Sequence, residues 1–326
     1  MDMLDGIFPG SIIVMDSGDE KSAAPWGELM SKTSMEKGAK GALIHGGIRD
    51  TEEIIKHEFP VYACYHSPLT AVYRYNIIDF NNPIIIGDVK INPGDYVFGD
   101  IDGVICIPKE IIDSCIKRRG RLHVFEKINP LKTALIVIDM QNSWVRPNMS
   151  VLEIPKTRGI INNINKIAEA LRTAGGHIIW TKSTFNCEWT PQMYENYADR
   201  NIINKMMEET SEEHDGFKIY EKMEYKSQDV ICKKYRPSAF IQGSSDIEKV
   251  LKEKGCDTLI ISGTLTNACC ESSARDAAAL GYKVLFLSDG TATRTDIEHN
   301  AALINLMQLV ADVRTTGDVI DLIKKT

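Results

Sequence analysis

The chain has 326 residues, and at roughly 150 residues per domain this length predicts two domains. Hydrophobic residues account for 43% of it and charged residues for 25%, which is typical of a folded globular protein and excludes a disordered one. The formal net charge of −7 excludes a general electrostatic attraction to nucleic acid or to anionic lipid.

The beginning of the chain and its cysteines indicate a cytoplasmic protein. The opening segment, MDMLDGIFPG, is acidic and has neither the basic nor the apolar stretch of a secretion signal. No run approaches the roughly 18 apolar residues of a membrane span. The 8 cysteines form no CxxC pair, which predicts reduced thiols and no zinc site. We therefore expect no nucleic acid and no membrane among the partners.

The first part of the chain is predicted to be rich in strands. Short apolar runs separated by glycine and proline occur at 11–16, 41–46, 60–64, 83–89 and 95–108. Helices are predicted at 27–38 and 109–119. The segment from Gly120 to Pro130 has no sustained periodicity, so we expect a linker there and domains at 1–128 and 129–326.

The second part alternates between strands and helices. Apolar runs typical of buried parallel strands lie at 134–138, 177–181, 229–233, 257–262 and 282–287. Between two of them Ile160, Ile164, Ile167 and Leu171 share one helical face. Two capping boxes, Ser245–Glu248 and Thr295–Glu298, predict helix starts. The alternation predicts an α/β fold, a doubly wound parallel sheet with helices on both faces.

Three side chains near the ends of these strands make a nucleophilic set. Ligands of open α/β sheets bind beyond the carboxyl ends of the strands, where Asp139, Lys234 and Cys269 are expected. A helix N-terminus and Lys234 would lower the pKa of the Cys269 thiol, and Asp139 would take and return its proton. Each residue also has a structural interpretation. Asp139 could cap a strand end, Lys234 could be an exposed charge beside Lys233, and Cys269 could fill the core.

The segments that carry these residues resemble those of a known family. Three segments, ALIVIDMQNSW at 134–144, ICKKYRPSAF at 231–240 and GTLTNACCESSARDA at 263–277, are similar to the signature blocks of the isochorismatase-like cysteine hydrolases. The resemblance covers about residues 130–326. It implies a catalytic triad of Asp139, Lys234 and Cys269, with Lys233 as the alternative lysine and Cys270 as a packing residue.

The resemblance also implies an oxyanion hole and a reaction. A cis peptide would join Thr264 to Leu265, and the backbone N–H groups of Leu265 and Cys269 would bind the oxyanion. Cys269 would attack an amide or ureido carbonyl, release ammonia or an amine, and leave a thioester for water to hydrolyse. No cofactor is implied for this domain. Nicotinamidase-like members carry an Asp-x-His metal cluster where this chain has TKSTFNCEWT (181–190), so we do not expect a metal-dependent nicotinamidase.

The substrate is indicated less directly. The segment YRPSAF most resembles the branch of N-carbamoylsarcosine amidase and the ureido acids. Arg236 could pair with a substrate carboxylate in bidentate geometry, and Trp144, Phe185 and Trp189 could line an apolar pocket wall. The alternative is that Arg236 is a surface residue and that the aromatic residues belong to the core.

The first part of the chain resembles the RraA-like family, which includes 4-hydroxy-4-methyl-2-oxoglutarate aldolases. The similar segments are 26–50, 59–64 and 91–108. The resemblance implies a small β/β/α domain in which Arg49 holds a 2-oxo acid, Asp50 binds Mg²⁺ and Glu28 orients metal-bound water. In the alternative interpretation Asp50 is the N-cap of a helix. Members of this family normally have several dozen residues before the segment that corresponds to PGSIIVMD (9–16), so the resemblance implies a domain truncated at its N-terminus.

The expected function is therefore that of an amidohydrolase acting on a small amide or ureido substrate. One alternative is a Mg²⁺-dependent aldolase or decarboxylase acting on 2-oxo acids. Another makes the first domain a non-catalytic oligomerisation module. Because members of the RraA-like family assemble as trimers or hexamers, we also expect a homo-oligomer.

Overall fold

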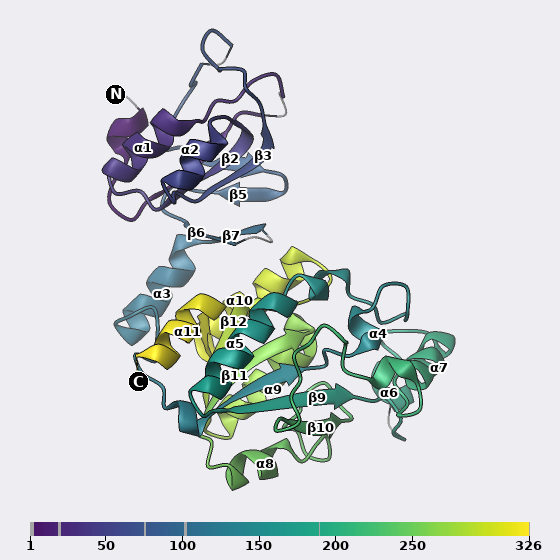
Figure 1. Cartoon of the computed structure of the whole chain (residues 1–326). Coiled ribbons are helices and arrows are strands. Elements are labelled where there is room, and N and C mark those ends of the chain that lie inside the picture. Colours follow the sequence, from purple (N-terminus) through teal and green to yellow (C-terminus); the bar gives the residue numbers. More distant parts are fainter. Residues whose placement is uncertain (1–2, 19–20, 75, 101–102, 189, 326) are drawn as a thin grey trace. The chain divides into compact units, whose positions relative to one another are not determined.

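The computed structural model describes residues 3–18, 21–74, 76–100, 103–188 and 190–325. The chain divides into two compact units, residues 1–113 and 114–326 (Figure 1). This division lies within helix α3 (Lys109–Arg119), ahead of the predicted boundary at 128. None of the described helices is long and apolar enough to cross a lipid bilayer.

The first unit contains a three-stranded parallel sheet. Its strands are β1 (Ile12–Asp16), β2 (Gly41–Ile48) and β3 (Val61–His66), in that order. Two helices, α1 (Glu28–Glu36) and α2 (Thr51–Lys56), follow β1 and β2. Trp26, Ile44, Ile54 and Phe59 are among the buried residues of its core. Strands thus form at the apolar runs predicted for this part.

Two antiparallel hairpins complete the first unit. The run at 83–89 contributes to a pair of short strands, β4 (Ile84–Ile86) and β5 (Val89–Ile91). The run at 95–108 folds back on itself as β6 (Tyr96–Asp100) and β7 (Gly103–Ile107). A short 3-10 helix, Met3–Gly6, precedes β1.

The second unit is built on a six-stranded, fully parallel sheet in the order β10-β9-β8-β11-β12-β13. The strands are β8 (Thr133–Ile138), β9 (His177–Ser183), β10 (Val230–Lys234), β11 (Thr258–Thr264), β12 (Lys283–Ala292) and β13 (Asp312–Arg314). All five predicted strands are present. The sixth strand, β13, was not predicted because it has only three residues, which are too few to show a hydrophobic pattern.

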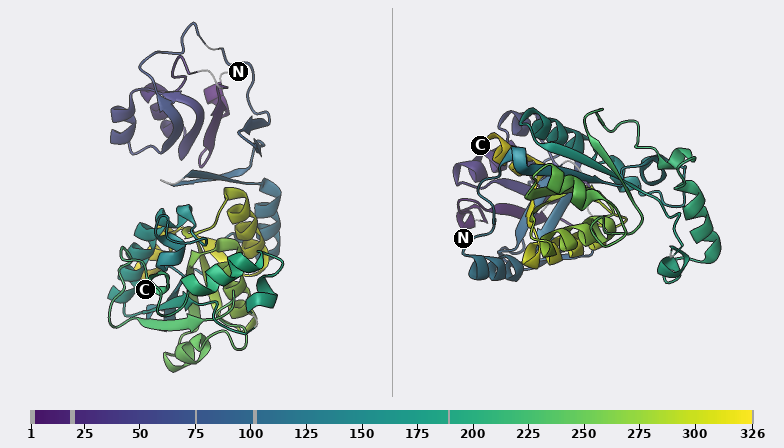
Figure 2. Two further views of the ribbon diagram at one scale, coloured as in Figure 1. Left: turned by 90° about the vertical axis from the view of Figure 1, so that its right-hand side faces the viewer. Right: turned by 90° about the horizontal axis from the view of Figure 1, so that it is seen from below.

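Helices cover both faces of this sheet (Figure 2). The α-helices of the unit are α4 (Asn142–Val145), α5 (Ile161–Thr173), α6 (Thr190–Tyr194), α7 (Arg200–Glu209), α8 (Ile247–Glu253), α9 (Glu271–Ala279), α10 (Asp296–Leu309) and α11 (Thr316–Lys324). Short 3-10 turns lie at Pro130–Lys132, Pro155–Arg158 and Asp215–Phe217.

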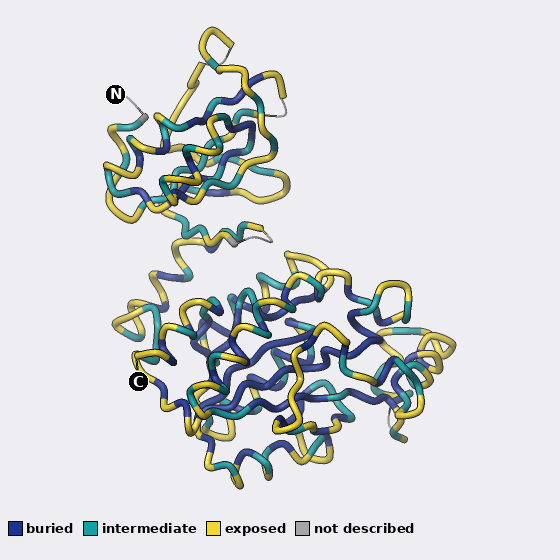
Figure 3. Tube along the Cα trace, in the orientation of Figure 1, coloured by how far each residue is buried: buried dark blue, intermediate teal, exposed yellow. Residues whose placement is uncertain are grey.

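Successive side chains of a strand point to opposite faces of the sheet, so they pack against different helices. Leu135, Ile260 and Leu285 lie on one face and share a core with buried residues of α5 and α11. Their neighbours Ile136 and Ile261 are fully buried outside that cluster, which places them on the opposite face. Figure 3 shows the strands as the most continuous buried part of the unit. The predicted doubly wound α/β architecture is therefore confirmed.

One of the two predicted capping boxes is wrong. The hydroxyl of Ser245 donates to the Ala239 oxygen at 2.7 Å, while Glu248 pairs with Lys252, so α8 begins without a reciprocal cap. The Thr295–Glu298 box is confirmed at the start of α10. The two sequences carry the same motif, but α8 has Asp246 as its N-cap residue, and the Ser245 hydroxyl accepts from the Ile247 amide at 3.2 Å.

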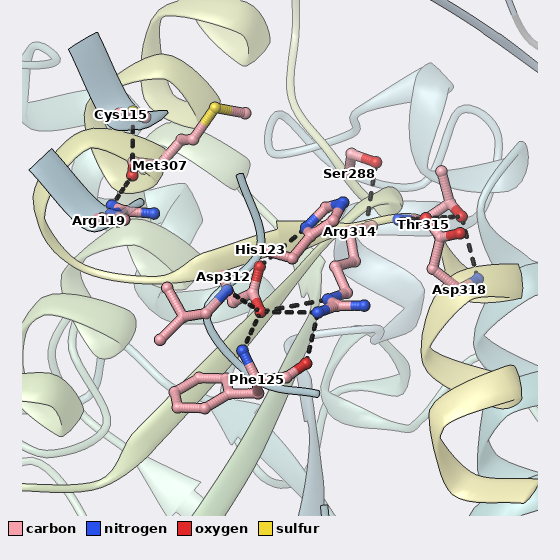
Figure 4. Close-up of polar contacts among 11 residues, drawn as sticks. Cys115, Arg119, His123, Phe125, Ser288, Met307, Asp312, Arg314, Thr315 and Asp318 are labelled. Carbon is pink, nitrogen blue, oxygen red and sulfur yellow. Dashed lines mark hydrogen bonds and ion pairs between the residues drawn. The ribbon is translucent and has the colours of Figure 1, made fainter. Parts of the chain in front are cut away.

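The expected linker is bound to the second unit. The buried carboxylate of Asp312 in β13 accepts hydrogen bonds from His123 at 3.0 Å and from the amides of Val124 and Phe125 at 2.9 Å each (Figure 4). Arg314 also donates to the same carboxylate and to the Phe125 oxygen. Residues 123–125 form no helix or strand, but these bonds make them an anchored part of the second unit.

Candidate active site

The strand order places the carboxyl ends of β8 and β11 at a switch point. From β8 the chain first adds β9 and β10 on one side and then β11, β12 and β13 on the other. Such a reversal opens a crevice beyond the carboxyl ends of the two central strands. Asp139 directly follows β8, and Cys269 lies in a π-helical turn, Thr266–Cys270, that follows β11.

Lys234 joins these two residues from the edge of the sheet. It is the last residue of β10, and its side chain passes the end of β9, where Nζ lies 3.3 Å from Ser183 Oγ. Nζ reaches Asp139 Oδ2 at 2.8 Å and Cys269 Sγ at 3.4 Å. The side chains of Asp139 and Lys234 are both 0% exposed, so their ion pair is fully removed from water. The structure thus brings the three predicted residues together.

Lys233, the alternative lysine, is in a different environment. It is exposed and its Nζ bonds to Glu212 at 2.6 Å. Successive side chains of a strand point to opposite faces, so only one of the two lysines can reach the site. Lys234 is the one that does.

Two buried polar residues that the sequence analysis missed support Asp139 and Lys234. Asp139 has a left-handed backbone (φ 53°), and its Oδ1 accepts a hydrogen bond from the Thr181 hydroxyl at 2.7 Å. The Lys234 ammonium also donates to the main-chain oxygen of Arg236 at 2.9 Å and contacts Ser183. Thr181 and Ser183 end the same strand, β9, with side chains on one face. The sequence signal that could have found them is their spacing of two residues in a predicted strand, which places both side chains on one face of the sheet.

Burial changes the expected protonation of the nucleophile. It raises the pKa of the Cys269 thiol, and although Lys234 lowers that pKa, the charge of Asp139 and a hydrogen bond to it act the other way, leaving it at about 12. Lys234 thus lowers the pKa as predicted, but burial outweighs it, so the expected net lowering is wrong. Burial would also lower the pKa of Lys234, but the charge of Asp139 and the hydrogen bonds to Asp139 and Cys269 act the other way, and that pKa is raised. The site at rest holds a Lys234–Asp139 ion pair beside a neutral thiol.

The turn before Cys269 has the backbone that the resemblance implied. A cis peptide bond joins Thr264 to Leu265. Cys269 is buried, with 8% of the residue exposed, and Cys270 is fully buried and bonds through Sγ to the Ser262 oxygen. The roles of the Leu265 and Cys269 amides in an oxyanion hole remain predictions.

The aromatic residues expected near the site belong largely to the core. Trp144 and Phe185 are 5% and 3% exposed and lie in the hydrophobic cluster of the second unit, with Tyr194 packed against it. The rings of Trp144 and Phe185 lie 6.1 Å apart, and Phe185 lies 4.9 Å from Tyr194, edge to face in both cases. Tyr194 was not predicted. Burial raises the pKa of its hydroxyl, and the charges of Cys269 and Asp139 raise it further, so it stays protonated. Trp189 lies outside the described residues.

The side chain of Arg236 is half-buried at the site, and its main-chain oxygen accepts from Lys234. The expected pairing of its guanidinium with a substrate carboxylate remains a prediction. Within the described part of the chain, no group of three or more His, Cys, Asp and Glu side chains is arranged to hold a metal ion.

The residues predicted in the first unit also lie together. Arg49 donates to the Ala24 oxygen at 2.7 Å, and its Nε lies 3.5 Å from Asp50 Oδ2. The Asp50 side chain makes no capping bond to α2. Its Oδ2 instead faces the amide of Glu28, at the start of α1, at 3.4 Å. Asp50 is therefore the N-cap residue of α2 by position, as the alternative interpretation predicted, but its carboxylate bonds to the start of a neighbouring helix.

The two carboxylates predicted to serve Mg²⁺ already have neighbours. Asp50 Oδ2 lies 3.5 Å from Arg49 Nε, and the Glu28 carboxylate lies 3.6 Å from His57. Mg²⁺ is usually bound by one or two carboxylates, with water in its other positions. The binding of Mg²⁺ by Asp50, with Glu28 orienting metal-bound water, therefore remains a prediction.

Comparison with known proteins gives a match for each unit. Residues 133–318 match the family model described as the isochorismatase domain, and residues 1–106 match the one described as Aldolase/RraA. The ureidoacrylate amidohydrolase RutB of Acinetobacter baylyi is 26% identical over 214 residues, which cover 60% of this chain and 85% of RutB. RutB of Pseudomonas savastanoi pv. phaseolicola is 29% identical over 211 residues, covering 59% and 84%.

A further relative matches over a smaller share of its length. Protein DlpA of Legionella pneumophila is 31% identical over 137 residues, which cover 40% of this chain and only 21% of DlpA. Among solved structures, a cysteine hydrolase from Pseudomonas syringae pv. phaseolicola 1448A is 29% identical, with a TM-score of 0.56 over 63% of this chain and 99% of that one. Since the isochorismatase match covers more than half of the 326 residues, the chain belongs to the isochorismatase family, with an RraA-like domain preceding that part.

Proposed function

We propose that the second unit is a cysteine hydrolase that cleaves a C–N bond of a small amide or N-carbamoyl (ureido) compound. The position of Lys234 carries this proposal, because its Nζ contacts both Asp139 Oδ2 at 2.8 Å and Cys269 Sγ at 3.4 Å. The similarity to two ureidoacrylate amidohydrolases and to a cysteine hydrolase supports it.

The reaction starts from a neutral thiol. Because burial raises the pKa of Cys269 to about 12, the proton leaves Sγ as the sulfur attacks the carbonyl carbon and not beforehand. Asp139 receives this proton, and Lys234 stabilises the negative charge that develops on sulfur. The amides of Leu265 and Cys269 bind the oxyanion of the tetrahedral intermediate.

The intermediate collapses with breakage of the C–N bond. Asp139 gives its proton to the departing nitrogen, which leaves as ammonia or an amine, and the acyl or carbamoyl group remains on Sγ. Water then adds to the same carbonyl carbon and passes a proton to Asp139. Breakage of the C–S bond releases a carboxylic acid or a carbamate, and the proton returns to sulfur.

The surroundings of the triad support a substrate with an apolar part and an acidic one. Trp144, Phe185 and Tyr194 pack edge to face, and the edge of this cluster would contact the apolar part. Arg236, which follows Lys234 by two residues, would pair with a carboxylate in bidentate geometry.

Ammonia release from a panel of amides and N-carbamoyl amino acids tests the proposal. We expect turnover by the full chain that resists EDTA and is lost in Cys269→Ala. Cys256→Ala removes another buried thiol, just before β11, and should keep activity. If Cys269→Ala releases ammonia as fast as the unaltered chain, the proposal is wrong.

A second candidate activity concerns the first unit. The Aldolase/RraA match over residues 1–106 supports a lyase that acts on 2-oxo acids, with Arg49 holding the substrate carboxylate. Pyruvate formation that is lost in Arg49→Ala and on chelation would support this activity. Without pyruvate formation, a defined oligomer of the full chain in analytical ultracentrifugation would support the proposal that the unit is an assembly module.

A further inference from the structure

Side chains tie the turn that carries the nucleophile to one segment, the end of β12 and the first residues after it. Thr264, on one side of the cis peptide, donates its hydroxyl to the Ala292 oxygen at 3.1 Å. Thr293 donates its hydroxyl to Asn267 Oδ1 at 2.7 Å. Asn267 lies two residues before Cys269, so these bonds hold both ends of the stretch that leads to the nucleophile.

The central tie is a hydrogen bond between Thr266 and His299. His299 Nε2 lies 3.0 Å from the main-chain oxygen of Ser288, which can only accept, so this nitrogen carries the ring proton. Nδ1 lies 2.8 Å from the Thr266 hydroxyl, and in a neutral ring it accepts the hydrogen bond from that hydroxyl. The imidazole ring thus links β12 to the turn.

The position of the ring follows from the start of α10. The capping box of Thr295 and Glu298 fixes the first turn of this helix, and His299 is the next residue. Thr266 is fully buried and directly follows Leu265, whose amide we assign to the oxyanion hole. A shift of Thr266 would therefore move both the proposed oxyanion hole and Cys269.

We propose that His299 is a positioning residue that acts through Thr266 to hold Cys269 Sγ beside Lys234. The contact to be preserved is the 3.4 Å between Sγ and Nζ. Active-site geometry must be held to within a fraction of an ångström for full activity, so loss of this tie reduces turnover more than substrate binding. The role rests on the proposed hydrolase function, but the reactivity of the thiol reports on it without a substrate.

Four variants of the full chain test the role by kinetics. Thr266→Val and His299→Leu should each lower kcat at least tenfold with KM within about twofold, and Thr266→Ser, which keeps the hydroxyl, should recover most of kcat. The double variant should be no worse than the worse single one, because both changes remove the same hydrogen bond. Thr258→Val is the control. It removes a buried hydroxyl at the opposite end of β11, where Thr258 donates to Asp257, and should keep kcat.

Alkylation of Cys269 by iodoacetamide, followed by mass spectrometry, gives the readout that needs no substrate. Loss of the Lys234 contact raises the pKa of the thiol, so Thr266→Val and His299→Leu should react at least threefold more slowly than the unaltered chain or Thr258→Val. Unaltered rates in both would overturn the inference. Slow alkylation in both variants, with no ammonia release by the unaltered chain, would instead overturn the proposed function alone.

Discussion

Gly263 lies so close to Ile138 that a Cβ atom on it would come within 2.1 Å of the Ile138 carbonyl oxygen. The two residues are paired in register between β11 and β8, one residue before Asp139. Because the two main chains lie so close here, the ends of β8 and β11 are held together. This contact sets the spacing between Asp139 and the turn that carries Cys269.

Gly263→Ala should therefore destabilise the protein by about 3 kcal/mol or more, since main-chain atoms of Ile138 cannot move aside cheaply. Gly281 is the matched control. It has a similar positive φ, 92° against 109°, but a Cβ atom on it would meet nothing within 4 Å, so Gly281→Ala should cost only about 1–2 kcal/mol. Urea unfolding monitored by circular dichroism measures both, and equal losses would contradict the steric explanation.

Lys234→Met should destabilise the protein by about 3–5 kcal/mol, because it leaves the carboxylate of Asp139 buried without its cation. The double variant Lys234→Met/Asp139→Asn removes both charges and should regain a large part of this loss in urea unfolding. Neither variant should release ammonia. A double variant as unstable as the single one would show that the cost arises from packing.

The raised pKa of Cys269, about 12, predicts slow alkylation at neutral pH and a rate that climbs about tenfold per pH unit over pH 7–10, as the thiolate fraction rises. Asp139→Asn should speed the reaction, since the negative charge of Asp139 raises the pKa, and Lys234→Met should slow it, since Lys234 lowers it. Mass spectrometry of the Cys269 peptide gives the rates. A rate independent of pH over this range would mean that the thiol is already ionised.

Asp312→Ala should destabilise the second unit by about 2–4 kcal/mol, because His123, Arg314 and two main-chain amides lose their shared acceptor. Burial raises the pKa of Asp312, but the bonds from His123, Phe125 and Arg314 outweigh it and lower that pKa. A lowered pKa stabilises the fold above the unfolded value of about 4, so the difference between the two proteins should shrink as the pH falls below that value.

Urea unfolding at neutral pH and at about pH 3 measures this difference. Asp321→Ala, on the exposed side of α11, serves as the control and should change stability by less than about 0.5 kcal/mol. If Asp312→Ala behaves like this control, residues 123–125 are not anchored as described.

The sequence predicted those features that depend on strand ends. Asp139, Lys234 and Cys269 each lie at or beyond the carboxyl end of a recognisable apolar run, and parallel pairing must bring such positions to one edge. The pKa of Cys269 was predicted wrongly because burial, which no local pattern reveals, outweighs Lys234. Tyr194 and His299 were not found because each lies near residues distant in the sequence, Tyr194 near Asp139 and Cys269 and His299 beside Thr266.

The neutral state of Cys269 also affects how the protein withstands oxidants. Peroxides react with thiolates and not with thiols, so a thiol whose pKa is raised is a poor target for sulfenic acid formation. The burial that would slow the first step of the proposed reaction would thus also protect the sulfur between catalytic cycles.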